Sequence, residues 1–294
     1  MNDAIRTPDE LLTGLPDFPF EPSYHDFVGL RMAYLDEGDG DPVVFFHGEP
    51  TWSFLWRKVI PPVRDAAHRC IAPDLPGFGR SDKPTDLSWY SYDRHADAAA
   101  SLLEALDVRG ATVVVHDWGG PIGLRFAVEH PDRVARLVVL DTGLFTGRQP
   151  MNDAWFAFRD FVERTEDLPV GMLVRRGCKQ DPGDEVAAAY DAPFPTPESK
   201  AGILAFPELV PTELDHPSAA KMLEVGDALA RWQKPALVLF SDSDPIFTPE
   251  AARRLAARMP GAGPAEIVED AGHFLQEDKG EEIADRIVRF LATT

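Results

Sequence analysis

Short apolar runs alternate along the chain with segments of helical periodicity. The runs are VVFF (43–46), RCIAP (69–73), TVVVH (112–116), RLVVL (136–140), ALVLF (236–240) and AEIVE (265–269). Because they are continuously apolar rather than alternating, they predict strands that are buried on both faces and joined by helices into a parallel sheet. Two earlier segments, YHDF (24–27) and RMAYLDEG (31–38), predict an antiparallel pair at one edge. The pattern therefore predicts an α/β fold with a mostly parallel sheet of eight strands and helices on both faces.

This alternation stops between about residues 146 and 224. The interval contains helical patches and many prolines but no buried strand, as in WFAFRDFVER, VGMLVRRG and FPELVPTELDHP. A structureless loop of that length is improbable in a compact domain. We therefore expect an inserted helical cap at 146–224 and a main domain formed by 1–145 and 225–294.

Composition narrows the function classes. The 294 residues are 44% hydrophobic, enough for a sizeable core, and 49 acidic against 29 basic residues give a net charge of −20. This charge argues against a nucleic acid or an anionic membrane as partner. The N-terminus lacks the pattern of a signal peptide, and no run reaches the roughly 18 apolar residues of a membrane span. Cys70 and Cys178 could form a single bridge, but reduced thiols suit a chain of this size, and we expect a cytoplasmic protein.

An acidic residue stands where the strand at 112–116 meets a helix. Ligands bind beyond the carboxyl ends of parallel strands, and Asp117 follows this strand directly. The next residues, Trp118-Gly119-Gly120-Pro121, suit a tight turn into a helix. Strand, turn and helix form a nucleophile elbow, which G-x-S-x-G normally signals; here Asp117 takes the nucleophile's place and Val115 that of the first small residue. The alternative is that Asp117 only caps the helix.

Three other predicted strands are also followed by acidic residues or histidine. HGEP (47–50), SDSDP (241–245) and DAGH (270–273) each follow a predicted strand. Asp117, Asp244 and His273 then occur in the order nucleophile, acid and base that the α/β-hydrolases use. The agreement of these loops favours a catalytic site over a helix cap.

With these motifs the chain resembles the haloalkane dehalogenases of the α/β-hydrolase superfamily. The resemblance rests on HGEPTWSFLWR, APDLPGFGRSDKP, VVVHDWGG and DAGHFLQE, and on YDAPFPTPESKAGILAFPELVP in the cap. It covers the chain from about residue 25 onward. The HGEP form and the acid after the seventh strand resemble the branch with 1,2-dichloroethane-hydrolysing enzymes, in which two tryptophans hold the halide.

The resemblance implies a covalent mechanism that needs no metal and no organic cofactor. The Asp117 carboxylate would displace halide from an sp³ carbon and form an alkyl ester. The Trp118 indole would donate one hydrogen bond to the departing halide. Trp155, the only tryptophan of the cap, would donate the second. Alternatively, Trp155, Phe158 and Val162 form one apolar helical stripe that belongs to the core.

The ester would then be hydrolysed by water that His273 activates. Asp244 is the first candidate for the carboxylate partner of His273. Asp242 in the same segment and Asp141, at the end of the strand at 136–140, are the alternatives.

The HGEP turn has two expected roles. The backbone N–H groups of Glu49 and Trp118 would receive the oxyanion of hydrolysis, and the Glu49 side chain would position the water. A tight turn that needs only Gly48 and Pro50 is the structural alternative. Apolar substrates require an apolar pocket. Its candidate walls are Phe158, Phe206, Val210, Ile246 and Phe247, and an ordinary core position is an equal alternative for each of them.

Three other functions compete with this interpretation of the sequence. Epoxide hydrolases share the Asp nucleophile but use paired cap tyrosines, whereas 146–224 contains only Tyr190. Fluoroacetate dehalogenases place Arg where this chain has Trp118. A non-catalytic binding protein on the same scaffold has no reason to keep the three catalytic residues together. The expected partners are therefore a small apolar halogenated substrate, water and the halide product, in a monomer or homodimer.

Overall fold

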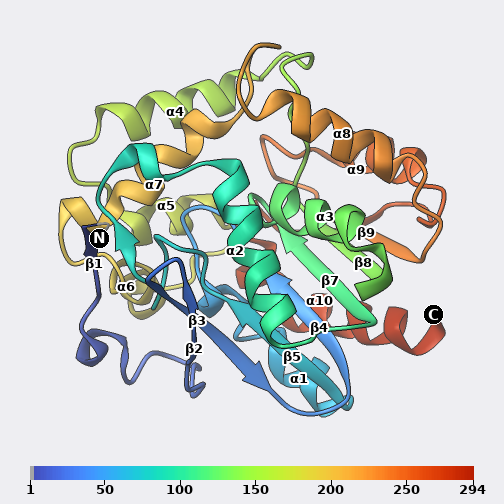
Figure 1. Cartoon of the computed structure of the whole chain (residues 1–294), viewed down its shortest axis with the longest axis horizontal. Helices are drawn as coiled ribbons and strands as arrows, with labels where there is room; N and C mark the ends of the chain where they lie inside the picture. Colours follow the sequence, from blue (N-terminus) through green and yellow to red (C-terminus); the bar gives the residue numbers. More distant parts are fainter. Residues whose placement is uncertain (1–2) are drawn as a thin grey trace.

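A computed structural model describes residues 3–294 and contains one central sheet of eight strands (Figure 1). Its order is β10-β9-β8-β7-β4-β5-β3-β2. The strands are β2 (Ser23–Phe27), β3 (Leu30–Glu37), β4 (Asp41–Phe46), β5 (His68–Pro73), β7 (Ala111–His116), β8 (Val134–Leu140), β9 (Ala236–Ser241) and β10 (Glu266–Val268). Within this sheet, as described for residues 3–294, only the β2–β3 and β3–β5 pairs are antiparallel. The predicted mostly parallel sheet with an antiparallel edge is confirmed. A separate short pair joins β1 (Ala4–Ile5) to β6 (Lys83–Pro84).

Helices cover both faces of this sheet, which explains why its central strands are continuously apolar. Every residue of β7 and β9 is buried. The helices of the sheet layers are α1 (Ile60–Asp65), α2 (Tyr92–Ala105), α3 (Gly119–Glu129), α8 (Ala219–Leu229), α9 (Pro249–Arg258) and α10 (Leu275–Thr293). In Figure 1, α2 and α3 lie in front of the sheet, and α1 packs on α10 behind it.

The segment between β8 and α8 is helical. It holds α4 (Asp153–Arg164), α5 (Val170–Gly177), α6 (Asp184–Asp191) and α7 (Ala201–Ala205). Short 3-10 helices complete the structure: η1 (Asp9–Leu12), η2 (Ser53–Trp56), η3 (Leu87–Trp89), η4 (Pro131–Arg133), η5 (Pro197–Lys200) and η6 (Phe206–Leu209). In Figure 1 the segment lies on the side to which the β7 arrow points. The expected boundary at residue 224 falls within α8, a helix that packs on α3.

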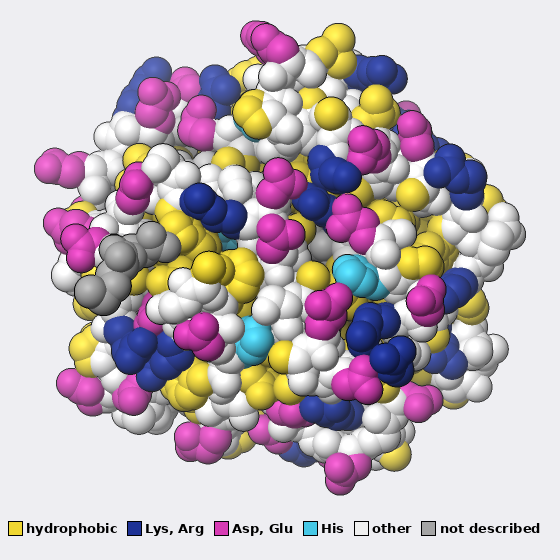
Figure 2. Space-filling view, viewed as in Figure 1, with side chains coloured by type: hydrophobic (Ala, Val, Ile, Leu, Met, Phe, Trp, Pro, Cys, Tyr) yellow, Lys and Arg dark blue, Asp and Glu magenta, His cyan; other side chains and the backbone are white. Residues whose placement is uncertain are grey.

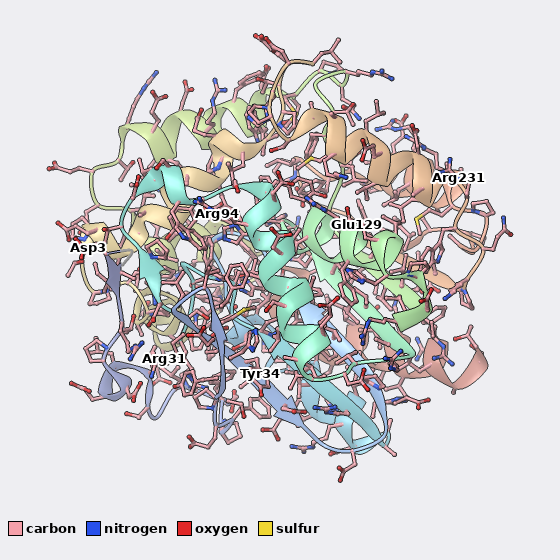
Figure 3. The ribbon with its side chains drawn as sticks, viewed as in Figure 1. Asp3, Arg31, Tyr34, Arg94, Glu129 and Arg231 are labelled. Carbon is pink, nitrogen blue, oxygen red and sulfur yellow. The ribbon has the colours of Figure 1, made fainter. Side chains whose placement is uncertain are left out.

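The surface carries charges of both signs. On the face shown in Figure 2, lysines and arginines are interspersed with acidic side chains rather than gathered in one patch. Figure 3 shows Arg94 of α2 and Glu129 of α3 on the helices in front of the sheet. Among residues 3–294, no helix combines the length and the apolar character that crossing a membrane requires. Cys70 and Cys178 are free thiols.

Candidate active site

Asp117 lies in a sharp turn between β7 and α3. Its φ of 48° is in the left-handed region, which side chains rarely adopt. The two glycines that follow are required by contact: a Cβ at Gly119 would collide with the Phe46 carbonyl, and one at Gly120 with the Thr142 side chain. The Thr142 hydroxyl donates to the Asp117 carbonyl at 2.5 Å. Close packing of α3 on the strand ends therefore fixes the backbone that presents the Asp117 carboxylate.

The HGEP turn holds this carboxylate from the other side. The Glu49 N–H donates to Asp117 Oδ1 at 2.9 Å, and the Trp118 backbone N–H also hydrogen-bonds the carboxylate. A Cβ at Gly48 would collide with the Asp117 side chain. Gly48 is thus needed so that the Asp117 carboxylate can approach the turn, whether or not the turn conformation also requires glycine.

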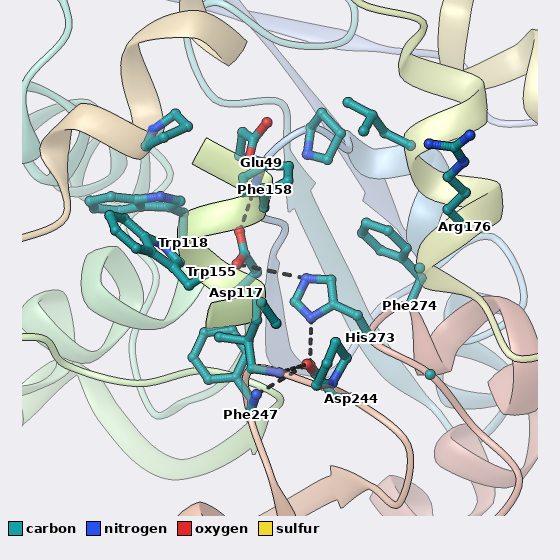
Figure 4. A pocket seen from close by; sticks show the side chains of 18 of the residues that line it. Glu49, Asp117, Trp118, Trp155, Phe158, Arg176, Asp244, Phe247, His273 and Phe274 are labelled. Atoms are coloured by element: carbon teal, nitrogen blue, oxygen red, sulfur yellow. Dashed lines mark hydrogen bonds and ion pairs between the residues drawn. The ribbon is translucent and has the colours of Figure 1, made fainter. Parts of the chain in front are cut away.

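His273 connects the Asp117 carboxylate to a second carboxylate (Figure 4). It lies in the loop between β10 and α10, with Nε2 3.7 Å from Asp117 Oδ2 and Nδ1 2.6 Å from Asp244 Oδ2. Asp244 follows β9, and its Oδ1 accepts the N–H groups of Ile246 at 2.7 Å and Phe247 at 3.0 Å. Loops after three strands thus bring the three predicted residues into one row, in which His273 hydrogen-bonds Asp244 and lies within ion-pair distance of Asp117.

The two alternative acids have other partners. Asp141 accepts both the N–H and the hydroxyl of Ser241, at 2.8 and 2.6 Å. Asp242 accepts the N–H groups of Asp270 and Ala271, so it holds the loop that leads to His273. Oxygen and nitrogen atoms of Asp141, Asp244 and His273 lie within 4.8 Å of one another, a spacing that metal sites also use. Here the hydrogen bonds to Ser241 and between Asp244 and His273 account for the cluster.

Burial and mutual charge shift the protonation of the whole group. Burial lowers the pKa of His273, but the charge and hydrogen bond of Asp244 and the charge of Asp117 outweigh it and raise this pKa to about 9. Burial alone would raise the pKa of Asp244, but His273 and two N–H donors hold this pKa below its ordinary value. Burial raises the pKa of Asp117, against the opposing effect of His273. Burial and a neighbouring carboxylate raise the pKa values of Glu49 and Asp141 well above the ordinary range, which favours their neutral forms.

The Asp117 carboxylate borders a cavity of about 610 Å³ whose walls are mainly apolar. Trp118 and Trp155 both line it, and Figure 4 shows their rings on the same side of Asp117. Trp155 comes from the first turn of α4, where the Asn152 side chain accepts the backbone N–H of Trp155 at 2.9 Å. The Asn152 amide also donates to the Pro245 carbonyl at 2.8 Å. The start of α4 is therefore tied to the loop that carries Asp244.

Four of the five predicted walls line the cavity: Phe158, Val210, Ile246 and Phe247. The prediction for Phe206 is wrong. Its side chain is buried behind Trp118, with the two rings in edge contact at 5.1 Å, so it supports the indole and does not face the cavity. Sequence reasoning missed further lining residues: Phe145, Phe161, Leu173, Cys178 and Phe274. Phe274 could have been found as the neighbour of His273, whereas the position of α5, which carries Leu173, depends on packing alone.

Comparisons with known proteins agree with this geometry. A family model described as alpha/beta hydrolase fold matches residues 41–280. The chain is 46% identical to a haloalkane dehalogenase of Mycolicibacterium paratuberculosis, over 97% of both chains. It is 42% identical to one of Psychrobacter cryohalolentis, over 98% of this chain and 97% of the relative. The solved haloalkane dehalogenase of Paraglaciecola agarilytica, described as tetrameric, superposes with a TM-score of 0.90 at 37% identity and 97% coverage of both chains. The chain therefore belongs to the haloalkane dehalogenases of the α/β-hydrolase fold, enzymes that hydrolyse carbon–halogen bonds.

Proposed function

We propose that Asp117 is the nucleophile of this dehalogenase and His273, paired with Asp244, the base. The observation that carries the assignment is the position of one carboxylate between two indoles that line the cavity and a histidine hydrogen-bonded to a second acid. In the first step, Asp117 Oδ2 attacks the halogen-bearing carbon. The carbon–halogen bond breaks, the halide leaves with the bonding electrons, and an alkyl ester remains on Asp117.

The geometry favours Oδ2 as the attacking atom. Oδ1 accepts the Glu49 N–H at 2.9 Å, whereas Oδ2 is the oxygen on the side of His273. After attack by Oδ2, Oδ1 is the carbonyl oxygen of the ester. It then already accepts the Glu49 N–H, which together with the Trp118 N–H would stabilise the oxyanion of the next step.

The two indoles suit the leaving halide. An indole N–H donates and does not accept, so it stabilises an anion without competing for the carbon. Trp118 and Trp155 line the cavity from different elements, the elbow and α4. We assign both indoles as hydrogen-bond donors to the halide.

Ester formation prepares the base for hydrolysis. The charge on Asp117 is one of the influences that raise the pKa of His273, and the ester carries no charge. Neutral His273 takes a proton from water, and the hydroxide attacks the ester carbonyl carbon. The tetrahedral intermediate then expels the alcohol, Asp117 regains a carboxylate, and one proton is released overall. Asp244 holds the Nδ1–H of the imidazolium.

The Glu49 side chain is assigned to the water. Its Oε1 is buried and has no hydrogen-bond partner among residues 3–294, and the residue lines the cavity close to both Asp117 and His273. A buried polar atom without a partner costs free energy unless a ligand or water satisfies it. This position suits a water directed at the ester.

Epoxide hydrolysis is disfavoured by the only cap tyrosine. The Tyr190 hydroxyl donates to Glu277 at 2.5 Å, and the side chain is fully buried and does not line the cavity. It cannot protonate an epoxide oxygen there. A fluoroacetate dehalogenase would need a cation at Trp118.

The assignment is tested by halide release from 1-bromobutane, with a short epoxide assayed in parallel. We expect bromide release by the natural protein and none by freshly prepared Asp117→Asn.

The choice of the acid is tested separately. Asp244→Asn should slow ester hydrolysis far more than Asp141→Asn in single-turnover assays, because Asp244 hydrogen-bonds His273 whereas Asp141 hydrogen-bonds Ser241. The reverse order would transfer the role to Asp141.

Domain organisation and context remain predictions. We propose that 146–224 acts as a cap over a main domain of 1–145 and 225–294, since the cavity is lined from both parts. The free thiols of Cys70 and Cys178 are consistent with a cytoplasmic location. Light scattering would decide between the expected monomer or homodimer and a tetramer. The substrate class, small apolar halogenated molecules, follows from the apolar walls.

A further inference from the structure

The Asp278 carboxylate joins two segments that border the cavity. Its Oδ2 accepts the N–H groups of Gly272 and Lys179, and its Oδ1 accepts that of Gln180, each at 2.8 Å. Gly272 immediately precedes His273. Lys179 and Gln180 follow α5, and Lys179 lines the cavity. One side chain on the first turns of α10 therefore connects the loop of the catalytic histidine to the segment after α5.

The same two segments also meet directly. The Phe274 N–H donates to the Gly177 carbonyl at 3.4 Å. A Cβ at Gly272 would collide with that carbonyl, and a Cβ at Gly177 would reach the Phe274 ring at 2.5 Å. The contact leaves no room for side chains, so a displacement of either segment moves the other.

The first turn of α10, which carries Asp278, is held by several contacts of the neighbouring Glu277. The neighbouring Glu277 is buried, receives both terminal nitrogens of Arg57, and accepts the Tyr190 hydroxyl of α6 at 2.5 Å. Lys58 Nζ donates to the Glu277 carbonyl at 2.7 Å. These contacts hold the first turn of α10 and keep Asp278 in place.

The catalytic loop has other supports as well. His116 Nε2 lies 2.8 Å from the His273 carbonyl oxygen, and Asp242 accepts two N–H groups just before this residue. Loss of Asp278 should therefore loosen the loop without unfolding it.

We propose that Asp278 is a positioning residue that keeps His273 directed at Asp117. The proposal rests on the roles assigned above to His273 and Asp117. Because displacement of halide needs no base, a misplaced His273 slows ester hydrolysis and leaves alkylation unchanged. A merely structural role would affect both steps.

The test compares Asp278→Asn with Asp285→Asn, the same change at an exposed position of the same helix. The asparagine amide has a single acceptor oxygen, so at least one of the three backbone N–H groups that donate to Asp278 would face an NH₂ group instead. With 1-bromobutane we expect an alkylation rate within about twofold of the natural protein and ester hydrolysis slower by about tenfold, as small misplacements produce. Rapid-quench bromide release and the lifetime of the butyl ester by mass spectrometry measure the two steps. The control variant should match the natural protein in both.

Equal slowing of both steps, a change in KM alone, or no change would overturn the proposal. His273→Phe, run alongside, keeps this result separate from the assigned mechanism. If His273→Phe accumulates ester but Asp278→Asn does not, only the role of Asp278 is wrong. If His273→Phe accumulates none, the mechanism itself is wrong. Should Asp278→Asn fail to fold, Asp278→Ser keeps one acceptor oxygen and takes its place.

Discussion

At the scale of single residues, the site assigns opposite protonation states to carboxyl groups that lie close together. Asp244 is held ionised by His273 and two N–H donors, whereas burial beside another carboxylate favours neutral Glu49 and Asp141. Side chains of one chemical type can therefore have different roles in one reaction, because their burial, neighbouring charges and hydrogen-bond donors differ.

Trp155 offers the sharpest residue-level prediction. If its indole donates to the halide, Trp155→Phe removes one hydrogen bond to an anion, worth about 1.5–3 kcal/mol, and should weaken bromide binding by about tenfold or more. Saturable quenching of intrinsic fluorescence by bromide measures the affinity. Trp232→Phe is the control, since Trp232 is buried outside the cavity. Equal affinities in the two variants would remove Trp155 from the halide site.

At the scale of elements, the unit that matters is the turn from β7 into α3. Gly120 packs against Thr142, the residue whose hydroxyl holds the Asp117 carbonyl. The helix can approach the strand ends this closely only without a side chain at this position. The position of the Asp117 carboxylate thus depends on the contact between Gly120 of α3 and Thr142, which follows β8.

Gly120→Ala should therefore cost stability as well as activity. The added Cβ has no free space, and overpacking of this kind costs about 1–3 kcal/mol in the free energy of unfolding. Urea denaturation measures it. Gly263→Ala, at a glycine with nothing within 4 Å, should change stability by less than about 0.5 kcal/mol. Equal stabilities of the two variants would mean that the turn yields without cost.

The sequence predicts most of this organisation because the strand pattern and the polar residues at strand ends are local signals. Asp117 and His273 stand in the motifs HDWGG and DAGH, whereas Asp244 has Asp242 and Asp141 as alternatives in the sequence. The failure at Phe206 has another cause: whether an aromatic side chain faces the cavity or supports Trp118 depends on how η6 packs. The link from Asp278 to Lys179 likewise joins residues 99 positions apart, with no motif to announce it.

At the scale of the whole molecule, the site brings together loops from distant parts of the chain. Asp117, Asp244 and His273 follow strands β7, β9 and β10. Their charges influence one another, so alkylation of Asp117, as proposed, should change the titration of His273. The two steps of the reaction should therefore have different pH dependences.

If His273 is the base, ester hydrolysis requires its neutral form, so the rate of this step should rise with pH to a plateau. In the resting enzyme the pKa of His273 is about 9. The ester lacks the Asp117 charge, and the midpoint for hydrolysis should lie below that value. Alkylation requires ionised Asp117, whose pKa is raised, so it should be lost on acidification at a pH above the ordinary aspartate range. Single-turnover assays across pH measure both; hydrolysis that slows as pH rises would exclude His273 as the base.

The division of the reaction between Asp117 and His273 is tested most directly by trapping the ester. His273→Phe, incubated with 1-bromobutane, should form the butyl ester and stop, because displacement needs no base and hydrolysis does. The account predicts one butyl group per chain by mass spectrometry, located on Asp117 by peptide mapping, with at most one equivalent of bromide released. Freshly prepared Asp117→Asn should give neither. Continued turnover by His273→Phe, butylation of another residue, or an adduct formed only from an epoxide would contradict it.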